Sequence, residues 1–130
     1  MRNLDEAVTQ VEAAIEEEPG ATAAHINLAT LQQARGKNEE AEAEFKRAVE
    51  MDPKSIQARL ALANFQWSSG DVPATEKTLT EARALQENDP LTNRMLAAFY
   101  LSTGRAAQAE LPLKTLAAGN KSPIASFALA

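Results

Sequence analysis

The sequence has 130 residues, of which 45% are hydrophobic and 24% charged, and it carries a formal net charge of -5 and no cysteine. This length and composition suit one globular domain or a few stacked units. Nucleic acid is not expected as a partner, because its binding relies on Lys and Arg that neutralise phosphates, and the lack of cysteine excludes disulfides and thiolate metal sites.

The first predicted element is a helix within residues 1–21. Its small and apolar side chains Ala7, Val11 and Ala14 recur at intervals of four and three, the spacing of one face of an α-helix. The same spacing returns in the second helix of every later unit. Residues 1–21 are therefore predicted to be the second helix of an incomplete preceding unit.

Three glycines, Gly36, Gly70 and Gly104, stand 34 residues apart, and each follows a run of helix-forming residues. They divide the middle of the chain into units 22–55, 56–89 and 90–121. With the glycine as position 15 of its unit, the same residue types return at the same positions. Position 7 holds Leu28, Leu62 and Leu96; position 8 holds Ala29, Ala63 and Ala97; position 20 holds Ala41, Thr75 and Ala109; position 24 holds Phe45, Leu79 and Leu113.

These positions recur at intervals of three and four residues, which predicts two amphipathic helices in each unit with the glycine between them. Glycine can end the first helix without steric cost, because it adopts the left-handed conformation. The small residues at positions 8 and 20 permit the two helix axes to approach closely, while the large residues at positions 7 and 24 fill the space beside that contact. Each unit is therefore predicted to be a helical hairpin.

The 34-residue period, with these large and small positions, resembles the tetratricopeptide repeat family over nearly the whole chain. The resemblance implies an all-α fold, a right-handed α-solenoid of stacked helix-turn-helix repeats. In that register residues 122–130 start a further first helix, with Ser122 as its N-cap and Pro123 in its first turn. The sequence is thus expected to be a fragment of a longer array, and its alanine-rich, cysteine-free composition favours a bacterial source.

The sequence departs from the family pattern at two places. Position 4, usually tryptophan in the family, holds His25, Arg59 and Asn93, so the packing there is expected to differ. Pro112 falls inside the last second helix, where a proline removes one backbone donor and clashes with the preceding turn. We expect a kink at this point or a late start to that helix.

The resemblance also implies a concave groove lined by the first helices, in which the family binds peptides. The residues expected to line this groove are Ile26, Thr30, Gln33, Leu60, Asn64, Trp67, Leu91, Arg94, Ala98 and Leu101. Trp67 beside Arg94 suits an interface anchor, but the alternative is that Trp67 packs against the neighbouring unit. The family's clamp for acidic chaperone tails is not expected, because Ile26 and Thr30 replace the required lysine and asparagine.

No catalytic chemistry is indicated. His25 is the only histidine, so neither a histidine-based triad nor a multi-histidine metal site can form within the chain, and His25 is expected to be a partly buried packing residue. There is no Gly-rich phosphate loop or nucleophile elbow. The prediction is a protein that is not an enzyme and needs no cofactor or metal.

The leading functional hypothesis is a protein-interaction scaffold that binds an extended peptide or a helix of an unidentified protein partner. The alternative is a structural spacer or self-assembling segment of a larger bacterial protein, with envelope or polysaccharide export as an example. Residues 1–21 carry a net charge of -5 and residues 90–130 carry +3, so head-to-tail self-association through the two truncated ends is one form of this alternative.

Membrane insertion is not expected, because no run of about eighteen apolar residues is present and the N-terminus lacks the apolar block of a signal peptide. A soluble protein is expected, with its compartment open between the bacterial cytoplasm and the periplasm.

Overall fold

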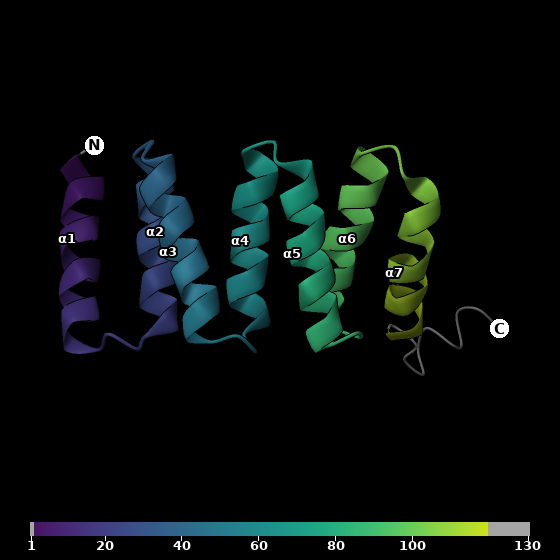
Figure 1. The fold of residues 1–130 in the computed structure, drawn as a ribbon, viewed down its shortest axis with the longest axis horizontal. Helices are drawn as coiled ribbons and strands as arrows, with labels where there is room; N and C mark the ends of the chain where they lie inside the picture. Colours follow the sequence, from purple (N-terminus) through teal and green to yellow (C-terminus); the bar gives the residue numbers. More distant parts are fainter. Residues whose placement is uncertain (1, 120–130) are drawn as a thin grey trace.

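The structure is a computed structural model that describes residues 2–119, and in this range it contains seven α-helices and no strand (Figure 1). The helices are α1 (Arg2–Glu17), α2 (Thr22–Ala34), α3 (Asn38–Met51), α4 (Ile56–Ser68), α5 (Val72–Leu85), α6 (Pro90–Ser102) and α7 (Ala106–Gly119). They stand side by side in a row, with α1 at one end and α7 at the other. The predicted further helix within residues 122–130 lies outside the described residues.

Each helix packs chiefly against its neighbours in the chain. The pairs α2 with α3, α4 with α5 and α6 with α7 form the hairpins, while α1 packs on α2, α3 on α4 and α5 on α6. Across the row, the first helices α2 and α4 also touch. This is the arrangement of a repeat solenoid, in which each unit contacts only adjacent units. The predicted all-α solenoid of helical hairpins is confirmed.

The three repeat glycines end the first helix of each hairpin as predicted. Their φ angles are +79° at Gly36, +83° at Gly70 and +75° at Gly104, all in the left-handed region. After Gly70 the backbone N–H of Asp71 bonds back to the carbonyl of Gln66 at 3.0 Å, which satisfies a carbonyl at the end of the helix. The chain can then reverse and start the second helix two residues after the glycine.

The small residues of the repeat are buried between the packed helices. Ala29, Ala63 and Ala41 are fully buried, so no side chain holds the paired helices apart. Large residues fill the space between units, as where the rings of Phe45 on α3 and Phe65 on α4 lie 5.4 Å apart. The core is thus a series of clusters between neighbouring helices, held by apolar burial.

The position-4 residue of the first complete unit is buried but polar. His25 is 4% exposed, and its Nδ1 atom lies 2.7 Å from Oε2 of Glu44 on α3. The expected packing role is present, but with a specific polar partner, because a buried polar ring is stable only when its nitrogens are hydrogen-bonded. His25 thereby connects α2 to α3.

Of the two outcomes expected at Pro112, a kink or a late start of the last helix, the late start is not observed. α7 begins at Ala106, two residues after Gly104, as α3 and α5 begin two residues after their own glycines. Pro112 is buried within α7, where the backbone bond to the Gln108 carbonyl cannot form. α7 also packs against its hairpin partner α6, and tertiary packing of this kind supplies most of the stability of a helix in a protein.

A candidate peptide-binding groove

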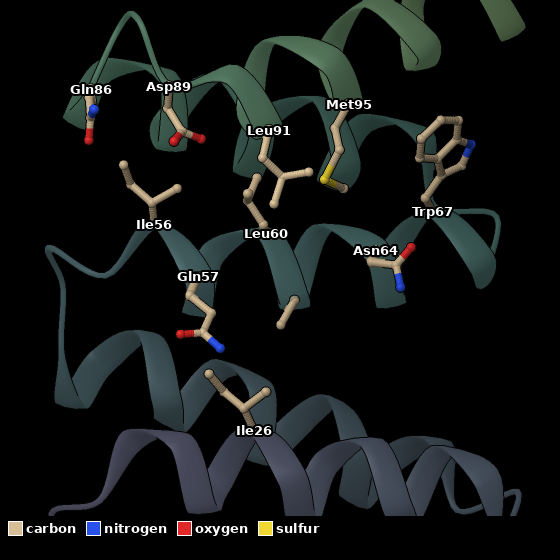
Figure 2. A pocket seen from close by; sticks show the side chains of 11 residues that line it. Ile26, Ile56, Gln57, Leu60, Asn64, Trp67, Gln86, Asp89, Leu91 and Met95 are labelled. Carbon is tan, nitrogen blue, oxygen red and sulfur yellow. The ribbon is translucent and has the colours of Figure 1, made fainter.

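An open groove of about 760 Å³ lies along the first helices, mainly between α4 and α6 (Figure 2). Its apolar side chains are Ile26, Ile56, Leu60, Ala61, Trp67, Leu91 and Met95. Its polar side chains are Gln57, Asn64, Gln86 and Asp89. The groove is therefore an apolar surface with amides and one carboxylate at its margins.

Helical spacing places the apolar residues opposite one another. Ile56 and Leu60 are one turn apart on α4, and Leu91 and Met95 are one turn apart on α6. Figure 2 shows the first pair directed toward the second, with Ile26 of α2 on the other side of α4. Leu60 is 6% exposed and Leu91 is 52% exposed, so Leu60 forms the floor and Leu91 the rim.

The polar residues of the groove differ in whether hydrogen bonds within the chain already occupy them. Asp89 is the N-cap of α6, where its Oδ2 atom accepts bonds from the Thr92 backbone N–H at 2.9 Å and from the Thr92 hydroxyl at 2.6 Å. Gln57, Asn64 and Gln86 are exposed amides. An amide both donates and accepts, so these three side chains match the backbone groups of a peptide.

Trp67 packs against the neighbouring unit and also lines the groove. Its ring meets that of Phe99 in the next unit edge to face, with centroids 5.5 Å apart and an interplanar angle of 84°. The same side chain lines the groove. Because the contact with Phe99 contributes to packing, a substitution of Trp67 changes the core as well as the groove.

The structure brings five of the ten predicted groove residues together: Ile26, Leu60, Asn64, Trp67 and Leu91. The other five, Thr30, Gln33, Arg94, Ala98 and Leu101, do not line this groove. Thr30 bonds to the Ile26 carbonyl of its own helix at 2.9 Å, and Gln33 donates to Oγ of Ser68 on α4 at 3.1 Å. Arg94 and Leu101 are exposed on α6 but do not line this groove.

The prediction omitted several residues that line the groove. Ile56 occupies position 1, and Ala61 and Met95 occupy position 6, each one helical turn or one residue from a predicted groove position. Adding these neighbours on the helical wheel would have found them. Gln86 and Asp89 come from the turn between α5 and α6, which a pattern of helix positions does not include.

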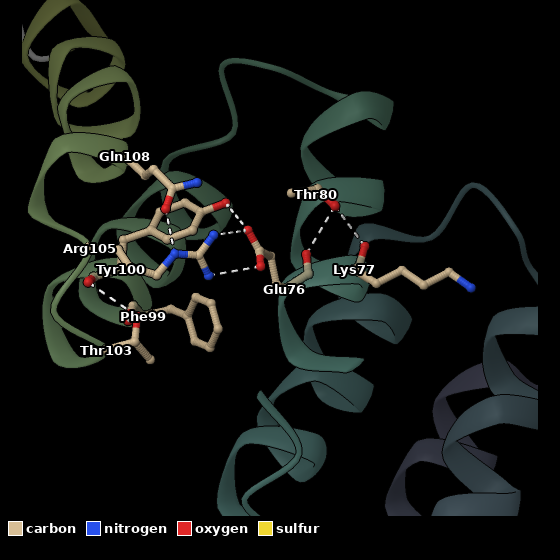
Figure 3. A network of polar contacts seen from close by, with 8 residues as sticks. All are labelled: Glu76, Lys77, Thr80, Phe99, Tyr100, Thr103, Arg105 and Gln108. Carbon is tan, nitrogen blue, oxygen red and sulfur yellow. Dashed lines mark hydrogen bonds and ion pairs between the residues drawn. The ribbon is translucent and has the colours of Figure 1, made fainter. Parts of the chain in front are cut away.

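A polar network connects α6 and the turn after it to α5 (Figure 3). Arg105 makes two bonds to Glu76, with Nη1 2.9 Å from Oε1 and Nη2 2.7 Å from Oε2. The Tyr100 hydroxyl donates to the same Glu76 Oε2 at 3.0 Å, and the guanidinium carbon of Arg105 lies 5.0 Å from the centre of the Tyr100 ring. Such a two-pronged ion pair has a defined geometry.

The network shifts the pKa values of Glu76 and Tyr100. The Arg105 guanidinium, followed by the Tyr100 hydroxyl, lowers the pKa of Glu76 below its ordinary value, against an opposing effect of burial. Burial, followed by the bond to Glu76, raises the pKa of Tyr100. Glu76 is thus held as a carboxylate and Tyr100 as a neutral donor.

Neither a metal site nor a membrane span is found in the part of the chain that the structure describes. Among those residues, no group of three or more His, Cys, Asp or Glu side chains is arranged to hold a metal ion. None of the described helices is long and apolar enough to cross a membrane.

The sequence matches the tetratricopeptide repeat family over residues 1–64 and again over residues 33–91. The chain belongs to the tetratricopeptide repeat family. Among curated protein sequences, none matches it. The family assignment agrees with the hairpins, the glycine turns and the 34-residue period described above.

Solved tetratricopeptide structures share the fold. The crystal structure of MamA matches with a TM-score of 0.71 at 19% identity, covering 87% of this chain and 66% of MamA. TTC0263, a thermophilic TPR protein of Thermus thermophilus, matches with a TM-score of 0.77 at 19% identity, covering 93% of this chain and 68% of that protein. PcrH, crystallised with the chaperone binding region of PopD, matches with a TM-score of 0.59 at 20% identity, covering 92% of this chain and 82% of PcrH. This tetratricopeptide chain spans about two thirds of the length of MamA.

Proposed function

We propose that this tetratricopeptide chain is a non-enzymatic scaffold that binds a protein partner by holding an extended peptide or a helix in the groove between α4 and α6. The observation that carries the proposal is the open apolar surface formed by Ile56, Leu91 and Met95 beside exposed amides. Concave apolar sites with a few polar groups bury anchor side chains and fix their orientation. The tetratricopeptide fold implies interaction with proteins, and the neighbour PcrH was crystallised with a region of PopD.

The lining of the groove supports an apolar partner segment over an acidic one. Within residues 2–119, neither lysine nor arginine lines the groove, and the carboxylate of Asp89 is engaged in capping α6. An acidic peptide would therefore lose water around its charges without gaining a cation in exchange. The preferred ligand is a segment with large apolar side chains whose backbone or polar groups meet Asn64, Gln57 and Gln86.

The test is a selection of peptides from a random library displayed on phage, using the full chain as bait. Trp67 is the only tryptophan of the sequence and it lines the groove, so its fluorescence reports occupancy directly. Selected peptides should be rich in large apolar residues, and each should change the Trp67 emission on titration. A library that yields only acidic peptides, or peptides that bind without changing this emission, would contradict the proposal.

A matched pair of variants locates the site. Leu91 and Leu101 lie on the same helix and are 52% and 53% exposed, but only Leu91 lines the groove. Leu91→Asp should raise the dissociation constant of the selected peptides by about tenfold or more, because it places a charge at an apolar anchor site. Leu101→Asp should leave the affinity within about twofold, since most contacts outside an anchor site contribute little. Equal losses in the two variants would show that the groove is not the binding site.

The competing hypothesis is a spacer or self-assembling segment whose ends make the contacts. Its support is the charge difference between residues 1–21, with -5, and residues 90–130, with +3, and the position of α1 and α7 at opposite ends of the row (Figure 1). Sedimentation velocity at rising concentration separates the two hypotheses. Association that weakens with added salt supports head-to-tail stacking, because salt screens exposed charges; a monomer throughout the series contradicts it.

A further inference from the structure

The groove between α4 and α6 has a charged end. Among the described residues that line it, Asp89 alone carries a charge. Figure 2 shows Asp89 and Gln86 together on the turn between α5 and α6, near Ile56, whereas Trp67 marks the opposite end of the groove. Ile56 and Trp67 are about three helical turns apart on α4. The groove is therefore apolar along its length and acidic at the end near Ile56.

The capping of α6 occupies only one oxygen of Asp89. Both capping bonds, from the backbone N–H and the hydroxyl of Thr92, are accepted by Oδ2. Within residues 2–119, no hydrogen bond reaches Oδ1, and no lysine or arginine nitrogen lies within 4.0 Å of the carboxylate. A carboxylate can accept hydrogen bonds through both oxygens. Asp89 thus has an oxygen available to a ligand while it caps the helix.

Capping does not require the negative charge of Asp89. Ser55 stands at the same position of the repeat, immediately before α4, and its neutral side chain accepts from the Ala58 backbone N–H at 3.1 Å. Serine and aspartate cap helices about equally well. Before α2 the same position holds Ala21, which makes no side-chain cap bond at all. The charge at Asp89 is therefore an addition to the cap, found at this end of the groove.

The neighbouring charges also favour a cation. The turns 52–55 and 86–89, which precede α4 and α6, together carry a net charge of -2, from Asp52, Lys54, Glu87 and Asp89. The N-terminal ends of the two helices contribute about half a positive charge each, which leaves this end of the groove negative. A negative surface attracts a positively charged partner and orients it during the encounter.

On the basis of the function proposed above, we propose that the partner segment carries a lysine or arginine at one end of its apolar stretch, and that this side chain binds Asp89. Its alkyl part would lie on Ile56 and Leu91, and its charged group would meet Oδ1 of Asp89 and the side-chain carbonyl of Gln86. Asp89 is half-buried, and a carboxylate beside apolar side chains attracts a cation more strongly than one in open water. The basic end of the segment then lies away from Trp67.

Parallel peptide selections test the charge. Asp89→Asn removes the charge and keeps the cap, because asparagine caps helices about as well as aspartate. Asp71→Asn is the matched control, since Asp71 caps α5 by accepting from the Ala74 backbone N–H at 3.2 Å and does not line the groove. Each variant and the wild type serve as bait for one random peptide library displayed on phage.

Lysine or arginine beside the apolar residues should be enriched about threefold over the library for the wild type and Asp71→Asn, and not for Asp89→Asn. Equal enrichment for all three baits would overturn the proposal, and so would the absence of enrichment for the wild type.

A titration measures the pair directly. A peptide selected by the wild type and its version with glutamine in place of the basic residue are titrated by Trp67 emission. This replacement should raise the dissociation constant about fivefold for the wild type and less than about twofold for Asp89→Asn, because only the wild type loses a charge pair. Added salt should reduce the difference in the wild type. Equal losses in the two proteins would show that the basic residue does not bind Asp89.

The result for the cation is separable from the result for the groove. Apolar peptides that change Trp67 emission without any preference for a basic residue would keep the groove as the binding site and overturn the role of Asp89. If no selected peptide changed Trp67 emission, the groove itself would be contradicted, and the role of Asp89 with it.

Discussion

The Nε2 atom of His25 lies 3.2 Å from the carbonyl oxygen of Pro19, six residues earlier in the chain. The same relationship recurs in the next two units, where Arg59 donates to the carbonyl of Pro53 and Asn93 donates to the carbonyl of Glu87. All three side chains occupy position 4, and all three carbonyls lie in the turn before the unit. Three different polar side chains thus contact the preceding turn at the start of each first helix, where the family usually has tryptophan.

Asn93 allows a direct test of this fastening. It is fully buried, its amide donates to the carbonyls of Glu87 at 2.7 Å and Asp89 at 2.9 Å, and its Oδ1 accepts from Nε of Arg83 at 3.1 Å. Asn93→Leu should lower the free energy of unfolding by about 2 kcal/mol or more, because buried groups are left without partners. Asn64→Leu, at an exposed position, should change it by less than about 0.5 kcal/mol. Urea unfolding followed by circular dichroism measures both, and equal values would show that the bonds to the turn do not matter.

Replacing a glycine in these turns should lower the stability of the protein because of its backbone conformation alone. Gly70 has a φ of +83°, and a Cβ added there would meet no atom within 4 Å. Gly70→Ala should therefore lower stability by roughly 1 to 2 kcal/mol, the cost of the left-handed conformation for a residue with a Cβ. Gly20 has the same free space without a positive φ, so Gly20→Ala should be neutral or slightly stabilising. Thermal unfolding of the two variants decides the matter, and a neutral Gly70→Ala would refute the explanation.

The pKa shift of Glu76 predicts a pH dependence of stability. Its pKa in the folded protein is lowered, chiefly by Arg105, so the carboxylate contributes stability that is fully present above the ordinary value of 4.5 and is lost as pH falls through the lowered folded value. The wild type should thus melt at a higher temperature than Glu76→Gln near neutral pH, and this advantage should shrink at acid pH. Glu81→Gln, on the same helix but exposed, is the control and should show no such difference. An advantage that persists unchanged in acid would contradict the assignment.

Two adjacent alanines on α6 test the close approach of the helices. Ala97 at position 8 is 4% exposed, while Ala98 at position 9 is exposed. Ala97→Leu should cost about 1 to 3 kcal/mol, because the added atoms must push apart a close-packed contact. Ala98→Leu should lie within about 0.5 kcal/mol of the wild type, as expected for a surface substitution. If the two variants unfolded at the same urea concentration, small residues would not be what sets the spacing between helices.

Local rules made the hairpins predictable. Gly36, Gly70 and Gly104 terminate helices because of their own backbone freedom, and the spacing of residues such as Ala63 and Leu79 defines buried faces before any partner is known. In a repeat protein the same local rules also predict the packing between units, because each unit packs against a similar unit and equivalent contacts recur at every interface. The three helix pairs and their order therefore followed from the pattern of residues.

The groove was predictable only in part, because its lining depends on how one unit is rotated against the next. Leu60, Asn64 and Trp67 on α4 line the groove, as the face of a single helix predicts. Arg94 and Leu101 on α6 do not line the groove, while Leu91 and Met95 of the same helix do. The presence of Pro112 inside α7 also depends on tertiary structure, because contacts with α6 offset the one backbone hydrogen bond that a proline cannot make.

The amino-acid sequence by itself determined the elements and their succession, since helix periodicity and glycine conformation act over a few neighbouring residues. Only the tertiary structure decided which side chains share the groove, which polar atoms meet, and that position 4 became a hydrogen-bonding site. Those outcomes depend on distances of a few ångströms between residues far apart in the chain, such as the 2.7 Å between Arg105 and Glu76. No local pattern of residue types contains these distances, because packing of whole helices sets them.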